Sequence, residues 1–283
     1  MQSFPKIGFM QGRLCDQVDG KIQCFPWKDW EKEFIVAGSI GVHLMEWTLD
    51  LERVYENPIL TVDGQKKIKN LCAEFGINIP SLTGDCFMHA PFWKCARSKK
   101  NELKSLFLEI CQASAIVGVR KIVVPLVDNG RLESNEQEDE LLDFLLLNSK
   151  TFNKLGIQII FESDFNPAEL NQFIQKLPTE SFGINYDIGN SASLGFNPLE
   201  EFTAYGKRVL NVHVKDRLLG GTTVPLNKGA AKFVTVFEQL AKINYSGNFI
   251  LQTARAMKGE HARVLSEYIS MTNMWIENTK QNY

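Results

Sequence analysis

The chain has 283 residues, of which 44% are hydrophobic and 23% are charged. This composition is typical of a globular protein and excludes collagen-like, low-complexity and disordered classes. With 31 lysines and arginines against 33 acidic residues, the chain lacks the basic excess of a general nucleic-acid binder. The chain does not open on an apolar run of signal-peptide length, and no stretch approaches the roughly 18 apolar residues needed to span a bilayer. We therefore expect a cytoplasmic protein that binds neither nucleic acid nor membrane.

All six cysteines lie within the first 111 residues, and none forms a C-x-x-C pair. Disulfides are uncommon in a domain of this size that lacks a secretion signal. We therefore expect reduced cysteines that act mostly as small buried residues.

Eight short apolar runs rich in β-branched residues recur along the chain at intervals of 26 to 43 residues. They lack regular polar alternation, which is typical of strands covered on both faces. The expected strands are Lys6–Met10, Val42–Trp47, Asn78–Asp85, Lys121–Leu126, Ile157–Ser163, Phe182–Asn190, Val209–Asp216 and Asn248–Arg255.

The segments between these runs have helical periodicity and carry residues typical of helix ends. Gly76, Gly118 and Gly156 follow three of them, at the position where a helix most often ends. An Asn-Pro pair begins two more, at 166 and 197, with the cap residue before the proline. The expected helices are Trp27–Gly38, Asp63–Phe75, Ser98–Val117, Glu133–Leu155, Asn166–Leu177, Leu199–Tyr205, Ala230–Ile243 and His261–Asn278.

Eight strands alternating with eight helices predict an α/β fold, the (β/α)8 TIM barrel. A doubly wound open sheet is the competing arrangement, but it normally has a glycine-rich turn after its first strand. Here that turn reads MQGRL (Met10–Leu14) and has one glycine. Since no linker or shift in composition interrupts the chain, we expect one domain over residues 1–283.

Polar residues gather at the strand ends where a TIM barrel places its chemistry. Glu162, Asp187, His213 and Gln252 lie near the ends of strands five, six, seven and eight. Neighbouring strands are about 4.8 Å apart, so these four side chains can converge on one divalent cation. Their oxygen and imidazole donors suit Mn, Mg, Co or Zn. A single acidic residue or histidine at a strand end is more often a cap or a satisfied polar group; four at matching depth weaken that alternative.

Several segments resemble the xylose isomerase-like TIM barrels: IGFMQGRL at strand one, FES at strand five, YDIGNS at strand six, NVHVKD at strand seven and ILQTAR at strand eight. That family contains sugar and sugar-phosphate isomerases and 3-epimerases, inosose dehydratases and the endonuclease IV type of DNA-repair enzyme. The resemblance implies that residues 162, 187, 213 and 252 bind one divalent metal. It also implies that the strand-five glutamate, Glu162, transfers a proton.

Gln252 departs from this pattern, because the family usually has glutamate there. An amide oxygen can ligate a cation but brings no charge, so metal affinity should fall. The family's epimerases use the strand-five and strand-eight glutamates as a pair of proton-transfer groups, and an amide cannot serve in that role. One-base transfer by Glu162 through an enediolate, dehydration, and ligand binding without catalysis all stay open.

Cations after strands one, seven and eight predict an acidic or phosphorylated sugar as substrate. Each of them could instead be a salt-bridge partner, and Lys228, where relatives often carry an acid, could be a solvated surface residue. The resemblance places Glu46 where residues bind substrate hydroxyls or orient a ligand, and Asn190 where relatives carry a substrate-binding histidine; His89 is a candidate proton shuttle. The candidate substrate-binding residues are Arg13, Glu46, His89, Asn190, Lys215, Arg217 and Arg255.

The hypothesis is therefore a metal-dependent sugar or sugar-phosphate isomerase or epimerase with Glu162 as its base. The alternatives are a dehydratase and a barrel that binds a ligand without turning it over. A DNA-repair endonuclease is disfavoured, since a three-metal site needs many histidines and the chain has four. The expected partner is a small sugar, and a homo-oligomer is possible because two-fold assemblies are common among soluble enzymes.

Overall fold

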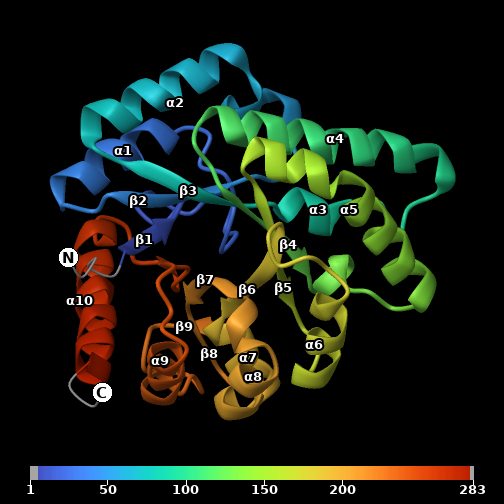
Figure 1. The fold of residues 1–283 in the computed structure, drawn as a ribbon. Coiled ribbons are helices and arrows are strands. Elements are labelled where there is room, and N and C mark those ends of the chain that lie inside the picture. Colours follow the sequence, from blue (N-terminus) through green and yellow to red (C-terminus); the bar gives the residue numbers. More distant parts are fainter. Residues whose placement is uncertain (1–5, 281–283) are drawn as a thin grey trace.

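The computed structural model describes residues 6–280, in which eight parallel strands form a closed barrel (Figure 1). β1 pairs with both β2 and β10, and these contacts close the ring. This confirms the predicted TIM barrel. The barrel strands are β1 (Lys6–Met10), β2 (Leu44–Thr48), β3 (Asn78–Thr83), β4 (Lys121–Leu126), β5 (Gln158–Ser163), β6 (Phe182–Asp187), β7 (Val209–Val214) and β10 (Asn248–Leu251).

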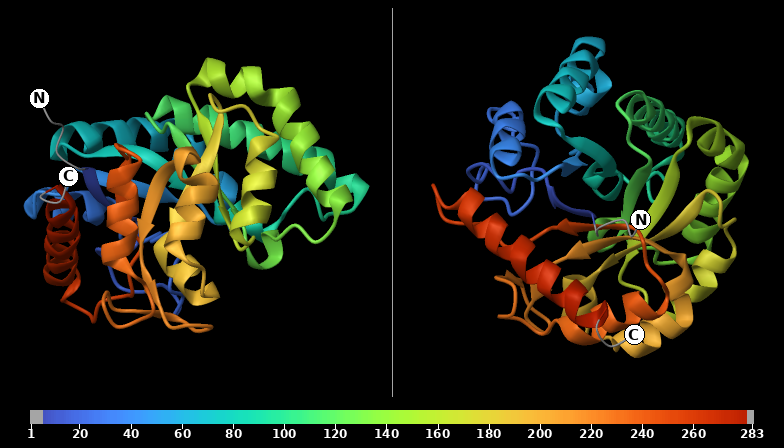
Figure 2. Two further views of the ribbon diagram at one scale, coloured as in Figure 1. Left: turned by 60° about the horizontal axis from the view of Figure 1, so that its bottom comes forward. Right: turned by 60° about the vertical axis from the view of Figure 1, so that its left-hand side comes forward.

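An outer ring of helices covers the barrel, as the two views in Figure 2 show. The Asn166 side chain accepts hydrogen bonds from the backbone N–H groups of residues 168 and 169, and Glu169 reaches back to it, so the predicted helix start is confirmed. Gly76 and Gly156 end their helices at a φ of +66°, a conformation that favours glycine. The ring contains α1 (Trp30–Ser39), α2 (Val62–Phe75), α4 (Arg97–Ile116), α5 (Asn135–Leu155), α6 (Pro167–Gln175), α8 (Pro198–Tyr205), α9 (Phe233–Lys242) and α10 (His261–Lys280).

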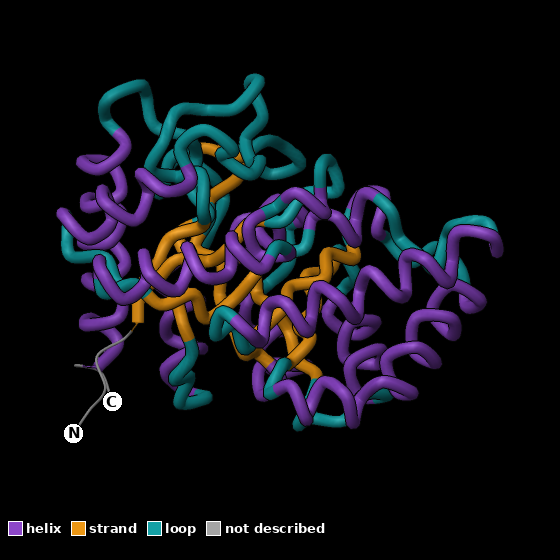
Figure 3. Tube along the Cα trace, turned by 90° about the horizontal axis from the view of Figure 1, so that it is seen from above, coloured by secondary structure: helices purple, strands orange, loops and turns teal. Residues whose placement is uncertain are grey.

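Short elements that the sequence pattern did not predict lie between the barrel strands and the outer helices. They are α3 (Asp85–His89), α7 (Ile188–Leu194), the antiparallel pair β8 (Asp216–Arg217) and β9 (Thr223–Val224), and the 3-10 turns η1 (Val54–Glu56), η2 (Pro58–Leu60), η3 (Asp128–Gly130) and η4 (Gly206–Arg208). Figure 3 shows long loops gathered on one side of the molecule.

Four strands end earlier than predicted: β3 stops at Thr83 instead of Asp85 and β7 at Val214 instead of Asp216, and the two largest differences are at β6 and β10. β6 stops at Asp187 instead of Asn190, because the Asp187 carboxylate accepts the backbone N–H of Asn190 at 2.8 Å and caps α7. β10 stops at Leu251 instead of Arg255, and the chain leaves the barrel there as a loop. Both differences put polar residues on loops and caps at the carboxyl ends of the strands.

Alternation along the strands separates an apolar layer from a polar interior. In β7, Val212 and Val214 are fully buried in the hydrophobic core, while Asn211 and His213 are equally buried but take part in polar contacts. Between strands and helices the core is rich in aromatic contacts, such as Phe161 against Phe173 at 5.1 Å between ring centroids. This packing holds the inward polar side chains on a rigid frame.

Two further expectations can be compared with the structure. All six cysteines are free thiols, as predicted. Between residues 6 and 280, no helix is both long enough and apolar enough to cross a membrane.

Candidate active site

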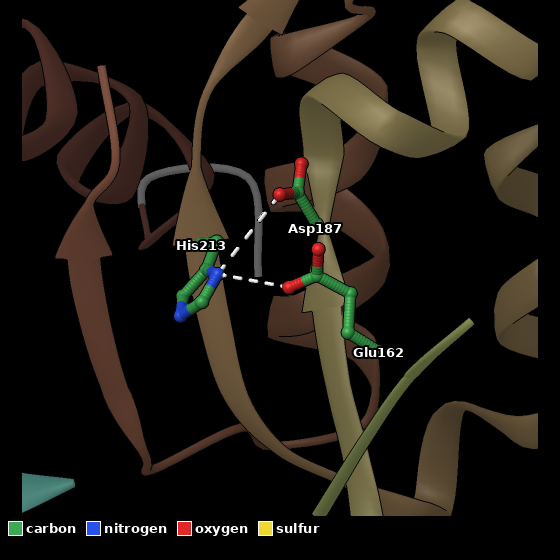
Figure 4. Close-up of side chains that lie close together, drawn as sticks. All are labelled: Glu162, Asp187 and His213. Carbon is green, nitrogen blue, oxygen red and sulfur yellow. Dashed lines mark ion pairs between the residues drawn. The ribbon is translucent and has the colours of Figure 1, made fainter. Parts of the chain in front are cut away.

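Three of the four predicted metal ligands meet at the carboxyl ends of β5, β6 and β7 (Figure 4). Glu162, Asp187 and His213 each offer a ligand atom, and these atoms lie within 4.8 Å of one another. His213 Nδ1 is 3.1 Å from Glu162 Oε2 and 3.9 Å from Asp187 Oδ2. All three residues are buried, so their charges interact with little screening by solvent.

The other imidazole nitrogen of His213 contacts Glu46, at 2.7 Å between Nε2 and Oε1. Glu46 is completely buried and also accepts bonds from the hydroxyls of Ser81 and Thr83, each at 2.5 Å, and from Asn211 Nδ2 at 3.1 Å. Of the two roles expected for Glu46, this geometry fits the orientation of a ligand, because its bonds go to protein groups beneath the site.

This arrangement directs His213 Nδ1 at two carboxylates. When Nε2–H donates to Glu46, Nδ1 is left as an acceptor 3.0 Å from Asn185 Nδ2, whose N–H can donate to it. A proton or a cation on Nδ1 would instead face the carboxylates of Glu162 and Asp187. Burial lowers the pKa of His213, but the charges and hydrogen bonds of Glu46 and Glu162 outweigh burial and raise it to about 10. One nitrogen and two carboxylate oxygens are a donor set that fits a divalent cation.

The two carboxylates have opposite pKa shifts. Burial alone would raise the pKa of Glu162, but His213 and Lys215 overcome it and the pKa lies below its usual value. Burial raises the pKa of Asp187, and Glu162 adds to that rise while Lys215 opposes it. Glu162 also accepts N–H bonds from Asn185 at 2.8 Å and Asn190 at 2.6 Å, which fix its carboxylate.

Gln252, the fourth predicted ligand, is linked to the group through Lys215. The Lys215 ammonium donates to Asp187 Oδ2 at 3.1 Å and to Gln252 Oε1 and Asn190 Oδ1, each at 3.2 Å. The Gln252 amide oxygen and the Asp187 carboxylate therefore face a common positive charge.

A cleft of about 730 Å³ opens above these groups. Arg217 bonds Asn190 Oδ1 at 2.8 Å and the carbonyl of Gly221, and His89 is exposed at the rim. The predicted residues that line the cleft are Arg13, His89, Glu162, Asn190, Lys215, Arg217 and Gln252.

Arg255 departs from the expectation that it faces substrate. Its guanidinium donates to the backbone carbonyls of Gly12 and Cys15, and it is absent from the cleft lining. Arg255 therefore ties the loop after β1 to the end of β10.

Arg13 lines the cleft and has unused hydrogen-bonding capacity. It is 5% exposed, its Nε donates to the carbonyl of Thr253 at 2.8 Å, and its buried Nη1 has no partner among residues 6–280. Burial and the nearby Arg255 lower the pKa of Arg13 to about 9. The loop that carries it is held by buried Glu33, which accepts the backbone N–H groups of Gly12 and Leu14 and whose pKa burial raises to about 7.

A family model described as xylose isomerase-like TIM barrel matches residues 34–269. The chain belongs to this family. A relative from Escherichia coli strain K12 with the name "Putative L-ribulose-5-phosphate 3-epimerase SgbU" is 22% identical over 267 residues, which cover 89% of this chain and 92% of the relative. A relative of the same name from Haemophilus influenzae is 21% identical and covers 79% of this chain and 83% of its own length.

Solved structures of the family share the fold. A xylose isomerase domain protein from Planctomyces limnophilus superposes with a TM-score of 0.73 at 18% identity, and the match covers 99% of this chain and 100% of that one. D-psicose 3-epimerase from Clostridium cellulolyticum H10, solved with D-tagatose, superposes with a TM-score of 0.75 at 11% identity. That match covers 96% of this chain and 99% of the epimerase chain. At such identities the likeness establishes the barrel alone.

Sequence reasoning missed several residues that contact or support the candidate site. Asn185 and Asn211 precede Asp187 and His213 by two positions, so strand alternation could have identified them as inward-facing partners. Gln23 and Glu33 gave no such signal, because one lies in an irregular loop and the other on α1.

Proposed function

We propose that this protein isomerises or epimerises a small sugar by proton transfer at a carbon next to a carbonyl, with Glu162 as the base. The supporting observation is that Glu162 lines the cleft, carries a lowered pKa and is fixed by two amide donors. A base must be ionised and held within reach of the proton that it removes. The epimerase names of the family's relatives point to the same reaction class.

A divalent cation, Mn²⁺, Mg²⁺, Co²⁺ or Zn²⁺, would be held by Glu162, Asp187 and His213, with the Gln252 amide oxygen as a neutral fourth donor. When bound, it would polarise the sugar carbonyl and the adjacent hydroxyl. Glu46 would keep Nδ1 of His213 directed at the ion. Because the ligand set carries two negative charges instead of the family's usual three, affinity for the ion should be modest.

The substrate that this cleft favours carries an anionic group such as a phosphate. Arg13 supports this proposal because it is buried, lines the cleft and has an unpartnered donor. A guanidinium matches phosphate or carboxylate oxygens with two parallel N–H bonds. Lys215 and Arg217 already bond protein oxygens, so Arg13 is the better candidate for the anion.

A barrel that binds a sugar without turning it over is the second candidate, and Gln252 favours it, since an amide replaces a family carboxylate. The two candidates predict different outcomes in heavy water. An isomerase or epimerase exchanges the hydrogen next to the carbonyl with solvent, whereas a binding protein leaves it in place.

The test incubates protein loaded with Mn²⁺ or Zn²⁺ with a panel of pentoses, hexoses and their phosphates in D₂O and follows the substrate by proton NMR. We expect exchange with at least one sugar, reduced about 100-fold or more by Glu162→Gln. Glu74→Gln, at an exposed position on α2, is the matched control and should leave the rate unchanged. Binding of a sugar with no exchange across the panel would contradict the proposal and favour the second candidate.

A further inference from the structure

Four side chains from distant segments form a hydrogen-bonded chain across the mouth of the barrel. Gln252 Nε2, at the end of β10, donates to Gln23 Oε1 in the loop after β1 at 2.8 Å. Gln23 Nε2 donates in turn to Asp85 Oδ2, just after β3, at 2.7 Å. At its other end the chain begins with Lys215, whose Nζ donates to Gln252 Oε1 at 3.2 Å.

The two ends of this chain define its direction. A lysine ammonium can only donate hydrogen bonds, and above the raised pKa of Asp85, about 7, its ionised carboxylate can only accept them. Each glutamine between them must therefore accept on the side of Lys215 and donate on the side of Asp85. This fixes both amide orientations, and the Gln252 oxygen points at the cation-binding side of the site.

From this direction we propose that Gln23 and Asp85 are positioning residues that hold position 252 as a neutral amide. Since the amide is matched to its neighbours, it is a working part of the site and not a remnant of a lost glutamate. This inference rests on the proposed function for its chemical consequence: Glu162 is the one proton-transfer group of the pair. The site would therefore move a proton on one face of the substrate, as an aldose–ketose isomerisation requires, and would not invert a centre with two opposed carboxylates.

A glutamate at position 252 would interrupt this chain of hydrogen bonds. Its carboxylate would face Gln23 Oε1, so two acceptors would oppose each other. If Gln23 turned over to donate to the new carboxylate, its oxygen would face Asp85 Oδ2 instead. In either case two acceptor oxygens face each other without a hydrogen between them. In a site shielded from water, such a pair lowers the stability of the folded protein.

A second substitution should repair this mismatch. In Asp85→Asn the new amide can accept from Gln23, so the substitution alone should be tolerated. Combined with Gln252→Glu, it can donate to Gln23 Oε1, which lets Gln23 turn over and donate to the carboxylate at 252. The two substitutions should therefore be coupled, and a double-mutant cycle measures that coupling.

The experiment measures Tm of the metal-free, sugar-free protein at about pH 8.5 for wild type, Gln252→Glu, Asp85→Asn and the double variant. We expect Gln252→Glu to lower Tm by about 2–6 °C and Asp85→Asn to leave it unchanged or raise it, because this substitution removes a buried charge. The double variant should return to within about 2 °C of the Asp85→Asn variant. Gln112→Glu, an exposed position on α4, is the control for adding a charge and should leave Tm unchanged.

Proton exchange at the substrate provides a second readout of the same cycle. Gln252→Glu should slow exchange about tenfold or more, and Asp85→Asn should recover most of the loss. Additive effects in Tm, or a single Gln252→Glu variant that is as stable as wild type and gains epimerisation, would overturn the inference. If no sugar is turned over by any variant, the proposed function fails, while the Tm cycle still decides whether the amide is matched to its neighbours.

Discussion

The floor of the site, beneath the metal-binding side of His213, and its mouth, at the cleft, contain the same kinds of polar residue. They differ in how far their side chains are hydrogen-bonded to other protein groups. The floor consists of Glu46, Ser81, Thr83, Asn211 and His213, and Glu46 accepts four hydrogen bonds from the others. Within residues 6–280, Asn211 Oδ1 is the one buried polar side-chain atom of these five residues that lacks a partner. At the mouth, the buried Nη1 of Arg13 has no partner among the described residues. The Lys215 ammonium there donates hydrogen bonds to three side-chain oxygens.

This difference separates positioning from recognition. A carboxylate with its bonds taken by protein donors has no capacity left for a substrate, so the floor can only hold His213 in place. The mouth contains cations that can exchange protein oxygens for those of a ligand. A substitution should therefore affect stability and metal binding at the floor, and substrate affinity at the mouth.

The largest effect is expected at the floor. Glu46→Gln replaces an acceptor by an N–H₂ group that must face one of four donors, and it leaves His213 without its buried carboxylate. We expect a loss of about 3–5 kcal/mol in the free energy of unfolding and a 10–100-fold weaker affinity for the divalent ion. Urea unfolding and calorimetric titration with Zn²⁺ measure the two effects. Unchanged metal affinity would contradict the assignment of Glu46 as the residue that orients His213.

A pH effect of comparable size is expected from Glu33, below the loop that carries Arg13. Its pKa rises from 4.5 to about 7 on folding because of burial. A raised pKa gives a stabilising contribution that is complete below pH 4.5 and is lost as the pH rises to 7, by at most about 3 kcal/mol.

Glu33→Gln should flatten this part of the stability profile in urea unfolding between pH 4.5 and 7. Some slope should remain, since burial also raises the pKa of Asp85 to about 7. Glu74→Gln, at an exposed position, should keep the wild-type slope. A Glu33→Gln profile parallel to wild type would show that Glu33 does not titrate in this range.

A smaller effect, confined to substrate binding, is expected at the mouth. Arg13→Ala should raise KM for a phosphorylated substrate about 10–100-fold, because a charge-assisted bidentate contact is lost. The unphosphorylated sugar should be affected less than threefold, and Arg13→Lys should recover part of the difference. Equal increases in KM for both sugars would show that Arg13 does not bind the anionic group. Steady-state kinetics with the matched pair of sugars makes the comparison.

The smallest effect is expected from Lys228, a cation near the mouth that lies outside the cleft lining. Its side chain is exposed, and its backbone N–H donates to Asp216 Oδ2 at 3.0 Å and to the carbonyl of Pro225 at 3.1 Å. Lys228→Ala should change KM and kcat by less than about twofold. A larger change in KM would mean that the substrate extends over the loop between β9 and α9.

The barrel and the convergence of its strand ends could be predicted from the sequence, because strand spacing and side-chain alternation are local patterns. Glu162, Asp187 and His213 were identified this way, and the structure brings them within 4.8 Å of one another. The direction of each polar contact could not be predicted. Glu46, within β2, lies on the floor, and Arg255, four residues after β10, binds loop carbonyls, although the sequence pattern placed both near strand ends with the residues of the cleft.

The contribution of Gln23 was beyond sequence reasoning for a different reason. It lies in a long loop without periodicity, and its two partners are separated from it by 62 and 229 positions. Its role depends on the orientation of the Gln23 and Gln252 amides, which is fixed by Lys215 and Asp85 at the two ends of the hydrogen-bonded chain.

The most direct test of the central claim is the position of a bound ion. Crystals loaded with Zn²⁺ and measured at the zinc absorption edge should show one anomalous peak about 2.0–2.2 Å from His213 Nδ1 and from one carboxylate oxygen each of Glu162 and Asp187. The peak should vanish in Asp187→Asn. Loaded crystals of the wild type with no peak at these three residues, and with Lys215 still bonded to Asp187 and Gln252, would contradict the account.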